Sequence, residues 1–497
     1  MRYKLQRFQL FDEQGLDQST IKSLRLLIIA VAFGVIQFNI VAGIAMAGYL
    51  RSLGVGDFVF GLLYAIGPAL SPVQMVASYL LERTKARKRM FITAGLIQRL
   101  IWLPFGLVPF IIPMEYAPMR IWMVTLLLLV NAGAGPFMNV SFFSLAADLV
   151  PEHIRGRYFA VRMRVSTICG IFGGIMTAWI LDSFAPFYSY TFVFALASLM
   201  GTMDILCFFG VKFPPMGSSP KIEKSSAGQD TSQNPPAEQA VSAEKFSTML
   251  KTVFSNKPYM RFILFMTFWI FSINLSGPFV LVHLREGVLL SNTLITVAVQ
   301  ILPNISSVLI GARWGRPLDT HGNKPVMQLA NGILCFAPFL WIITTNNAIS
   351  VVIIMLIGLM HGMLLPGFDL GANNIMLGHA PRVNRSMYIA VYFTITSIIG
   401  IGLANATGGW LLDNVFSISE AMEISLVGVV LTRYSYLFGL TAILRCVMVY
   451  IALPRLVDDG STASPFDLLR DIIKNTRRSS YRMWQNVLAS TRKIKKR

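Results

Sequence analysis

Long apolar stretches alternate with short polar segments along most of the chain. A helix needs about 20 apolar residues to cross the ~30 Å hydrocarbon core of a bilayer. Stretches of that length lie near 24–50, 58–81, 90–113, 121–149, 158–181, 187–211, 261–284, 289–312, 325–345, 349–377, 387–412 and 434–454. The pattern therefore predicts an all-α membrane protein with twelve transmembrane helices.

The alternation stops once, between the sixth and seventh stretches. Residues 214–244 are mainly Pro, Ser, Gln, Ala and Glu, and such a segment buries too little apolar surface to offset the entropy of ordering, so it should be a flexible linker. Residues 246–254, just after it, have the spacing of a short amphipathic helix on the membrane surface. We therefore expect, in chain order, an N-terminal segment, a six-helix bundle, a linker, a second six-helix bundle and a tail. Their expected boundaries are 1–23, 24–212, 213–257, 258–457 and 458–497.

The two predicted bundles repeat each other. The motif P-x3-R-x2-Y-x-A-V occurs at residues 151–161 and again at residues 381–391. Further matches follow in chain order at offsets of 230 to 235 residues: Asn39 with Asn274, Arg51 with Arg285, Pro68 with Pro303, Pro136 with Pro366, and Asp182 with Asp413. A near-constant offset indicates internal duplication. We therefore expect two pseudo-symmetric six-helix bundles.

Charge supports a membrane protein and orients it. Only 13% of the residues are charged, against about 25% in soluble domains, and the net charge of +19 must collect in loops and tails. Most of the basic loop residues lie in 82–89, 150–157, 313–324 and 378–386. Basic loops stay in the cytoplasm, so we expect a multi-pass protein of the plasma (inner) membrane with both termini cytoplasmic.

The C-terminal tail is strongly basic, with ten Lys or Arg residues between positions 465 and 497. Phe466, Leu469, Ile473 and Trp484 recur at helical spacing, which predicts a basic amphipathic helix that binds anionic membrane lipids. Nucleic-acid binding is the weaker alternative because a membrane adjoins the tail. We expect no nucleic-acid partner.

Metal, nucleotide and disulfide chemistry has little support in the sequence. The four cysteines fall inside apolar stretches without paired spacing, so we expect free thiols rather than a disulfide or metal framework. No G-x4-G-K-[ST] phosphate-binding loop occurs, which argues against ATP-driven pumping. We expect no metal site, no other cofactor and no catalytic residues.

The loop after the eighth stretch has a distinctive order of residues, Gly315-Arg316-Pro-Leu-Asp319-Thr-His-Gly322-Asn-Lys324. It resembles the glycine–aspartate–glycine–basic loop that the major facilitator superfamily carries between its second and third helices and between its eighth and ninth. The pattern Asp148…Pro151…Arg155-Gly156 after the fourth stretch is also similar to that superfamily. The resemblance covers nearly the whole chain outside the linker and tails. It implies a secondary transporter that moves a small-molecule substrate by alternating access, and we expect a monomer.

The resemblance also implies a gate in the cytoplasmic loops. Gly315 and Gly322 would permit a tight turn, and Asp319 would lie at the positive N-terminus of the eleventh helix, a contact that holds one closed state. The first-half loop, 82–89, has no glycine and no aspartate, so the gate should be stronger in the second half. The expected gate residues are Gly315, Arg316, Asp319, Gly322, Lys324, Arg155 and Arg385.

Four ionisable residues lie inside the predicted spans, where a charge is costly. Arg99 and Asp204 are at matching depth in the first half, and Asp369 and Arg445 are at matching depth in the second. Each pair is therefore expected to form a buried ion pair. The resemblance places the third and sixth helices on the outside, which favours a structural role for Arg99 and Asp204. It places the tenth helix on the cavity, so Asp369 is also a candidate for proton coupling.

His361 is the sharper candidate for proton coupling. It lies near mid-membrane in the tenth stretch, and a histidine titrates near physiological pH. A neutral histidine that is hydrogen-bonded to a neighbouring helix is the equally weighted alternative. Protons are therefore a candidate second cargo beside the small-molecule substrate.

Amide side chains inside the spans are candidates for the substrate pathway. Hydrogen bonds between helices, worth about 0.6 kcal/mol each, are the alternative role. The repeat matches Asn39 with Asn274, which favours a binding site at the midplane between the two halves. The expected pathway residues are Asn39, Asn131, Asn274, Asn304 and His361. Weaker candidates are Gln37, Tyr64, Trp269, Asn373 and Asn374.

Two other classes of protein remain as alternatives to a transporter. A membrane-embedded lipid-modifying enzyme would need clustered acids or histidines at one membrane face, whereas the acids here are scattered through the spans. A non-transporting receptor or assembly factor built on a transporter scaffold would differ from a transporter in having no solute flux. The fifth stretch lacks the glycine–proline pair typical of drug–proton antiporters, so drug export has no support.

Overall fold

The computed structural model describes residues 17–215, 246–381, 385–418, 424–426, 429–456, 464–471 and 474. Twelve helical segments in these ranges are long and apolar enough to cross a membrane, which confirms the predicted number of transmembrane helices. Most of the expected linker and most of the basic tail lie outside the described residues. The side chain of Arg385 also lies outside them.

The first six spans are built from nine α-helices. A 3-10 turn, η1 (Met114–Tyr116), precedes the fourth span, and Gly43 separates the two helices of the first span. Pro68 lies inside the first helix of the second span and Pro72 precedes the next helix. The α-helices are α1 (Gln18–Ala42), α2 (Ile44–Ser52), α3 (Asp57–Ala69), α4 (Val73–Thr84), α5 (Arg87–Leu100), α6 (Trp102–Ile111), α7 (Ala117–Leu149), α8 (Glu152–Ser183) and α9 (Pro186–Phe209).

The last six spans are more interrupted, with several π-helical turns. The predicted surface helix is present as α10 (Phe246–Ser255). The spans comprise α11 (Lys257–Asn274), α12 (Gly277–Val282), η2 (His283–Gly287), α13 (Asn292–Thr296), η3 (Val297–Ile301), α14 (Leu302–Ile310), η4 (Gly311–Trp314), α15 (Gly315–His321), α16 (Asn323–Leu334), α17 (Ala337–Ile342), α18 (Ala348–His379), α19 (Arg385–Ile395), η5 (Thr396–Leu403), α20 (Ala404–Asn414), α21 (Arg433–Val447), η7 (Met448–Ala452) and η8 (Leu453–Arg455). A two-residue β-ladder joins β1 (Ser425–Leu426) to β2 (Val429–Val430).

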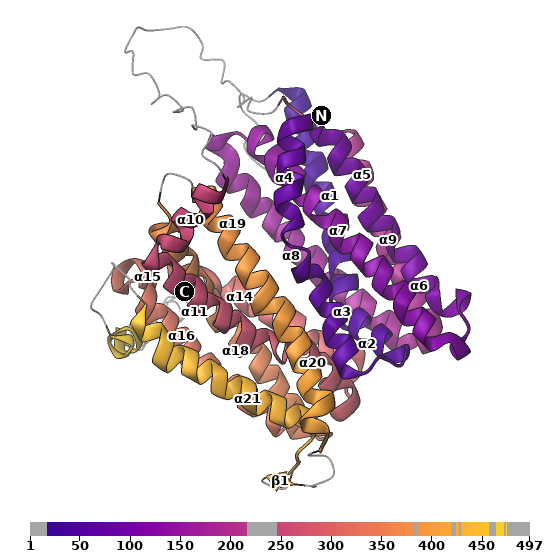
Figure 1. Ribbon diagram of the computed structural model, residues 1–497, viewed down its shortest axis with the longest axis vertical. Coiled ribbons are helices and arrows are strands. Elements are labelled where there is room, and N and C mark those ends of the chain that lie inside the picture. The colour runs from indigo at the N-terminus through magenta and orange to yellow at the C-terminus, as the bar shows by residue number, and fades with distance from the viewer. Residues whose placement is uncertain are drawn as a thin grey trace, which may run out of the picture.

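The helices form two bundles that follow the two halves of the sequence (Figure 1). In the first bundle, α1 packs against α8 and α9, and α5 packs against α7. In the second, α11 packs against η5, and α18 packs against both α14 and α16. Each bundle therefore has its own interior, as expected for a duplicated unit.

The bundles are joined on one side of the molecule only by a shared apolar core. One buried cluster includes Tyr49 and Phe105 of the first bundle together with Phe279 and Phe438 of the second. A second cluster holds only residues between 253 and 456, and a third only residues between 24 and 213. We call the side with the shared core the closed side, and the side nearest the linker ends, residues 215 and 246, the linker side.

Close backbone contact seals the closed side. Helix α3 packs against α20 and η5, and α8 packs against α13 and η3; α3 and α20 also lie together in Figure 1. A Cβ atom at Gly61 would lie 2.2 Å from the backbone oxygen of Asn405, and one at Gly409 would lie 2.3 Å from that of Asp57. Only glycine permits this approach, because a side chain at either position would overlap with backbone atoms.

The tyrosine of the repeated motif anchors each bundle in the same way. The Tyr158 hydroxyl donates to the carbonyl of Leu24 in α1, at 3.2 Å. In the second bundle, the Tyr259 hydroxyl of α11 donates to the carbonyl of Tyr388, at 2.9 Å, with the two rings edge to face. Leu24 and Tyr259 are 235 residues apart, the offset that also relates Asn39 to Asn274. The duplicated motif thus attaches the fifth-type helix to the first-type helix of its own bundle.

The start of the basic tail packs on the second bundle. Buried Leu468 contacts the apolar cluster of Trp314, Leu318 and Val326, and Asp471 lies 3.3 Å from Nε2 of His321. The predicted lipid-binding part of the tail is beyond these residues and outside the described part of the chain.

Candidate functional site

Ion pairs join the two bundles at the closed side. Arg51, at the end of α2, lies 2.6 Å from Asp57 in its own bundle and 3.1 Å from Glu286 in the other. Asp57 is fully buried and also lies 3.1 Å from Arg433, at the start of α21. Two arginines from different bundles thus share one buried carboxylate, so the closed side depends on charge as well as on apolar contact.

The arginines that the repeat matches make reciprocal contacts between the bundles. Arg51 donates to the hydroxyl of Tyr434, at the start of the last helix of the second bundle, at 2.7 Å. Arg285 donates to the hydroxyl of Tyr190, near the start of the last helix of the first bundle. The duplication therefore produces the same arginine–tyrosine contact twice, once in each direction across the interface.

The aspartates that the repeat matches also cross the interface. Asp182, at the end of α8, accepts from the backbone N–H of Asn292 and of Thr293, each at 2.9 Å, and from both of their side chains. Asp413, at the end of α20, accepts from the backbone N–H of Phe58 at 2.8 Å. Each carboxylate therefore binds the positive N-terminus of a helix in the opposite bundle, α13 or α3.

None of these closed-side residues was predicted as part of a site. Two of the matches, Arg51 with Arg285 and Asp182 with Asp413, were used only as signs of duplication. A usable signal was nonetheless present, because polar residues at the span ends that recur in both halves are candidates for symmetric contacts between the bundles.

At mid-membrane, one amide contact crosses between the bundles. Gln300 of η3 donates to Oδ1 of Asn39 and to the carbonyl of Gly170, the latter at 3.3 Å. Gln300 was not among the predicted site residues, although it is a polar residue inside the eighth span.

Asn274 does not take part in this mid-membrane contact. The Nδ2 atoms of Asn39 and Asn274 donate to the carbonyls four residues earlier in their own helices, at 2.9 and 2.8 Å. The expected meeting of Asn39 with Asn274 is thus not seen, and Asn39 meets Gln300 instead.

The other predicted pathway residues are dispersed. Asn131 donates to the carbonyl of Gln98 at 3.0 Å, a contact between helices of one bundle. Asn304 is exposed on α14. His361 lies on α18, with Nδ1 3.0 Å from the carbonyl oxygen of Ile357. The structure therefore brings no two of the five predicted pathway residues into hydrogen-bond contact within the described ranges.

A cavity of about 300 Å³ lies inside the first bundle, between α1, α5, α7, α8 and α9. The expected pair of Arg99 and Asp204 lines it, with Nη2 of Arg99 2.9 Å from Oδ2 of Asp204. Arg99 also donates to Gln37, and Arg162 lines the same cavity. The pair faces this interior cavity rather than the outside of the bundle.

A cavity of about 330 Å³ lies inside the second bundle. Arg445 and His361 line it together with Trp341 and mostly apolar side chains. The expected pairing of Arg445 with Asp369 is wrong, because Asp369 has an exposed side chain on α18 and no ion pair joins the two in the described residues. Asp369 is eight residues from His361, about 12 Å along the helix. Matching depth did not predict which face of the helix carries the acid.

The predicted linker-side gate is open in this structure. Arg316 and Asp319 are exposed. Lys324 donates to the carbonyls of Pro454 and Leu456, the latter at 3.1 Å, and so binds the end of the last span. Arg155 donates weakly to the carbonyl of Val150 at 3.4 Å. Each of these contacts joins residues of the same bundle.

The two glycines of the gate loop differ. Gly322 has φ +86°, a left-handed conformation that favours glycine. Gly315 has the helical φ −55° at the start of α15 and needs no such freedom. The expected tight turn therefore requires only the second glycine.

In the first bundle the basic loop has a different acidic partner. Arg87, at the start of α5, lies 2.6 Å from Asp148 near the end of α7. Arg87 also donates to the backbone and side chain of Ser144, both at 3.1 Å. The loop that lacks its own aspartate thus uses the aspartate of the following motif.

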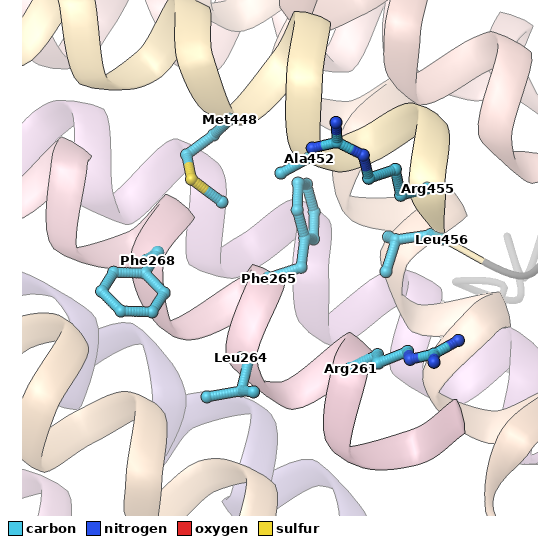
Figure 2. A pocket seen from close by; sticks show the side chains of 8 residues that line it. All are labelled: Arg261, Leu264, Phe265, Phe268, Met448, Ala452, Arg455 and Leu456. Carbon is cyan, nitrogen blue, oxygen red and sulfur yellow. The ribbon is translucent and has the colours of Figure 1, made fainter. Parts of the chain in front are cut away.

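A groove of about 560 Å³ lies at the linker side of the second bundle, between α11 and the η7–η8 segment. Figure 2 shows Phe268 and Met448 at one end, Arg261 extending toward the other, and Arg455 reaching back over Ala452. The groove is separate from the two interior cavities.

No group of three His, Cys, Asp or Glu side chains that could hold a metal ion occurs in the described ranges. The charged and amide side chains instead lie in the two cavities and along the interface between the bundles. Such an arrangement can bind a solute or change shape but offers no evident catalytic centre.

Comparison with known proteins identifies the family. A family model described as Major Facilitator Superfamily matches residues 25–404. No curated protein sequence matches the chain.

Among solved structures, the nucleoside transporter NupG is similar with a TM-score of 0.64 and 14% identity over 87% of this chain and 99% of its own. The xylose transporter XylE from E. coli, in an inward open conformation, has a TM-score of 0.59 and 11% identity over 89% and 98%. A bacterial homolog of the human lysosomal transporter Spinster, inward-facing and unoccupied, has a TM-score of 0.58 and 13% identity over 89% and 95%. The chain therefore belongs to the Major Facilitator Superfamily and is a membrane transporter rather than an enzyme.

Proposed function

We propose that this chain is a secondary transporter that moves a small solute by alternating access, and that the linker side faces the cytoplasm of the cell whose inner membrane it occupies. The one-sided closure of the two bundles carries this proposal. The shared apolar core and the ion pairs of Arg51, Asp57 and Arg433 all lie on one side. The apolar cores near the linker side stay separate.

The chemistry of the closed side suits a contact that must also open. Apart from the buried Asp57, its charged groups are partly solvated, with exposed side-chain fractions of 14% for Arg51, 27% for Arg433 and 42% for Glu286. Partly exposed ion pairs contribute little net stability, because water replaces the lost partner when they separate. Opening this side would therefore cost less than separating an apolar contact of equal area.

The orientation rests on charge. The loops on the linker side carry the clustered basic residues at 82–89 and 313–324, and such loops are retained in the cytoplasm. In that orientation the described state is inward-facing. The alternative state would close the linker side by bringing the loop of Asp319 toward the N-terminal end of α19.

Proton coupling through His361 extends the proposal. The contact of Nδ1 with the carbonyl of Ile357 leaves Nε2 available to the cavity. A proton taken up there would place a second positive charge beside Arg445, which favours binding of an anion or release of a cation. Asp369 is the other candidate for this role.

The decisive experiment is solute flux in proteoliposomes, with and without an imposed pH gradient. Nucleosides, pentoses, dipeptides and small organic acids would be supplied as separate labelled pools. We expect saturable flux of at least one class. The substitution Arg433→Asp, which places an acid beside Asp57 and Asp413, should abolish that flux, whereas Arg313→Asp on the linker side serves as the matched control.

The same assay tests the competing class. Folded protein that moves none of the four pools would favour a receptor or assembly factor on a transporter scaffold. Equal flux in Arg433→Asp and wild type would contradict the proposed role of the closed side.

A further inference from the structure

Arg445 is a buried cation without an acidic partner. Its residue is 7% exposed, and its Nε atom has no hydrogen-bond partner in the described residues. No ion pair in these residues includes it. A charge in a low-dielectric interior is strongly unfavourable unless it is paired, and an ionisable residue inside a membrane span usually has a function.

The cavity beside Arg445 is large enough for a small organic molecule. Its volume of about 330 Å³ lies at the lower end of the range for ligand sites, about 300–1,000 Å³. Apart from Arg445, His361 and Ser276, its lining side chains are apolar, and they include the flat indole of Trp341. The walls would thus accept an apolar body, and the charge would lie at one place.

His361 supplies a hydrogen-bonding atom to the same cavity. Its Nδ1 is paired with the carbonyl of Ile357, which accepts and so requires the proton on Nδ1. The neutral ring then presents Nε2 as an acceptor. The cavity therefore combines five N–H donors of a guanidinium with one acceptor, a set that matches an anionic group with a neighbouring hydroxyl or N–H.

We propose that this cavity binds the anionic group of a small organic solute, a carboxylate or a phosphate, with Arg445 as its counter-charge and Trp341 against its apolar body. The proposal rests on the function proposed above and names the substrate class. It also accounts for an interior arginine that no residue of the chain neutralises.

Thermal unfolding of the purified protein in detergent tests the proposal without requiring transport. The probes are anions, each paired with a neutral analogue at equal ionic strength: benzoate with benzamide, nicotinate with nicotinamide, lactate with lactamide, and phenyl phosphate with phenol. We expect at least one anion, but not its neutral analogue, to raise the Tm by more than about 2 °C. The first three pairs report a carboxylate and the last a phosphate.

Two substitutions and a control identify the site. Arg445→Gln should remove the preference for the anion, and Arg445→Lys should keep a weaker one because the charge remains. Arg89→Gln, an exposed arginine of the other bundle, should leave it unchanged. The proposal is overturned if no anion differs from its neutral analogue in the wild type, or if Arg445→Gln keeps the difference. Anion binding without flux would instead count against the proposed transport function.

A second inference comes from the groove between α11 and the η7–η8 segment (Figure 2). Leu264 and Phe268 are 51% and 53% exposed, as expected for side chains in contact with hydrocarbon. Arg261 and Arg455 are exposed at the same groove, and no ion pair in the described residues includes either one. Two cations above an apolar channel, at the end of two membrane spans, complement a phosphate head and an acyl chain.

We infer that this groove binds an anionic phospholipid. Native mass spectrometry with phosphatidylglycerol and with phosphatidylcholine of the same chains tests it. We expect about fivefold less bound phosphatidylglycerol in Arg261→Gln/Arg455→Gln, a loss consistent with about 1 kcal/mol for each basic residue at a lipid surface. Phosphatidylcholine should be unaffected. Undiminished phosphatidylglycerol, or an equal loss in the control Arg83→Gln/Arg89→Gln, would overturn the inference.

Discussion

The two interior cavities are similar in volume but differ in how their charges are compensated. In the first bundle, Arg99 is held by Asp204 and Gln37. In the second, Arg445 has no acidic partner in the described residues, although Asp204 and Arg445 both lie on the last span of their bundle. A duplicated framework thus contains one site that the chain neutralises itself and one that requires something from outside.

Local packing shows how closely the first site is built. A Cβ at Gly34 would lie 2.8 Å from Oδ2 of Asp204, and one at Gly201 would lie 2.6 Å from Cδ of Arg99. Glycines on α1 and α9 therefore make room for the ion pair. We infer that the first cavity mainly supports structure and that the second mainly binds the solute, so the halves share a frame but differ in function.

Removal of the acid from the first cavity should have the largest effect. Asp204→Asn leaves Arg99 and Arg162 without a carboxylate, and breaking a buried ion pair costs about 3–5 kcal/mol. We expect a loss of unfolding free energy of that size, measured by denaturant titration in detergent. Glu115→Gln, an exposed acid, is the control, and a loss below about 1 kcal/mol would contradict a structural role for the pair.

A methyl group next to the same ion pair should have a smaller effect. Gly34→Ala forces Asp204 to move because its carboxylate oxygen occupies the position of the new Cβ. Overpacking of this kind costs about 1–3 kcal/mol, and the same titration measures it. Gly133→Ala is the matched control because no atom lies within 4 Å of a Cβ there. Equal stability of the two variants would show that the pair can shift freely.

Removal of the charge from the second cavity should not destabilise the protein without ligand. Arg445→Met replaces an uncompensated buried cation with an apolar side chain of similar length. Replacements of buried charge by apolar groups are often neutral or stabilising, so we expect unfolding free energy that is unchanged or higher by up to about 2 kcal/mol. A loss comparable to that of Asp204→Asn would remove the difference between the two cavities.

The smallest expected effect on stability, with a specific effect on transport, is that of His361→Gln. Glutamine keeps a hydrogen-bonding group but cannot titrate. We expect that variant to fold normally and to lose any stimulation of flux by a pH gradient in proteoliposomes. Gradient-driven flux equal to that of the wild type would exclude His361 as the coupling residue and leave Asp369 as the candidate.

Much of the architecture could be predicted because it depends on local composition. The twelve spans follow from stretches of apolar residues, since transfer to hydrocarbon depends on the residues of each stretch. The duplication was visible in matched residues such as Asp182 and Asp413. The amphipathic spacing before the seventh span also predicted α10.

The sites were predicted less well because contacts depend on which face of a helix a residue occupies. Neighbouring residues in a helix point about 100° apart, so matching depth correctly suggested Arg99 with Asp204 but failed for Asp369 with Arg445. Asn39 meets Gln300 rather than Asn274, because the closed side sets the relative position of the bundles.

Taken alone, the sequence determined the number of spans, the twofold repeat and the residues that carry charge into the membrane. The tertiary structure decided which side is closed, which charges are paired and which cavity keeps an uncompensated arginine. The physical reason is one of range. Burial of apolar stretches is a local property of the chain, whereas compensation of a charge in a low-dielectric interior depends on atoms a few ångströms away that belong to distant parts of the sequence.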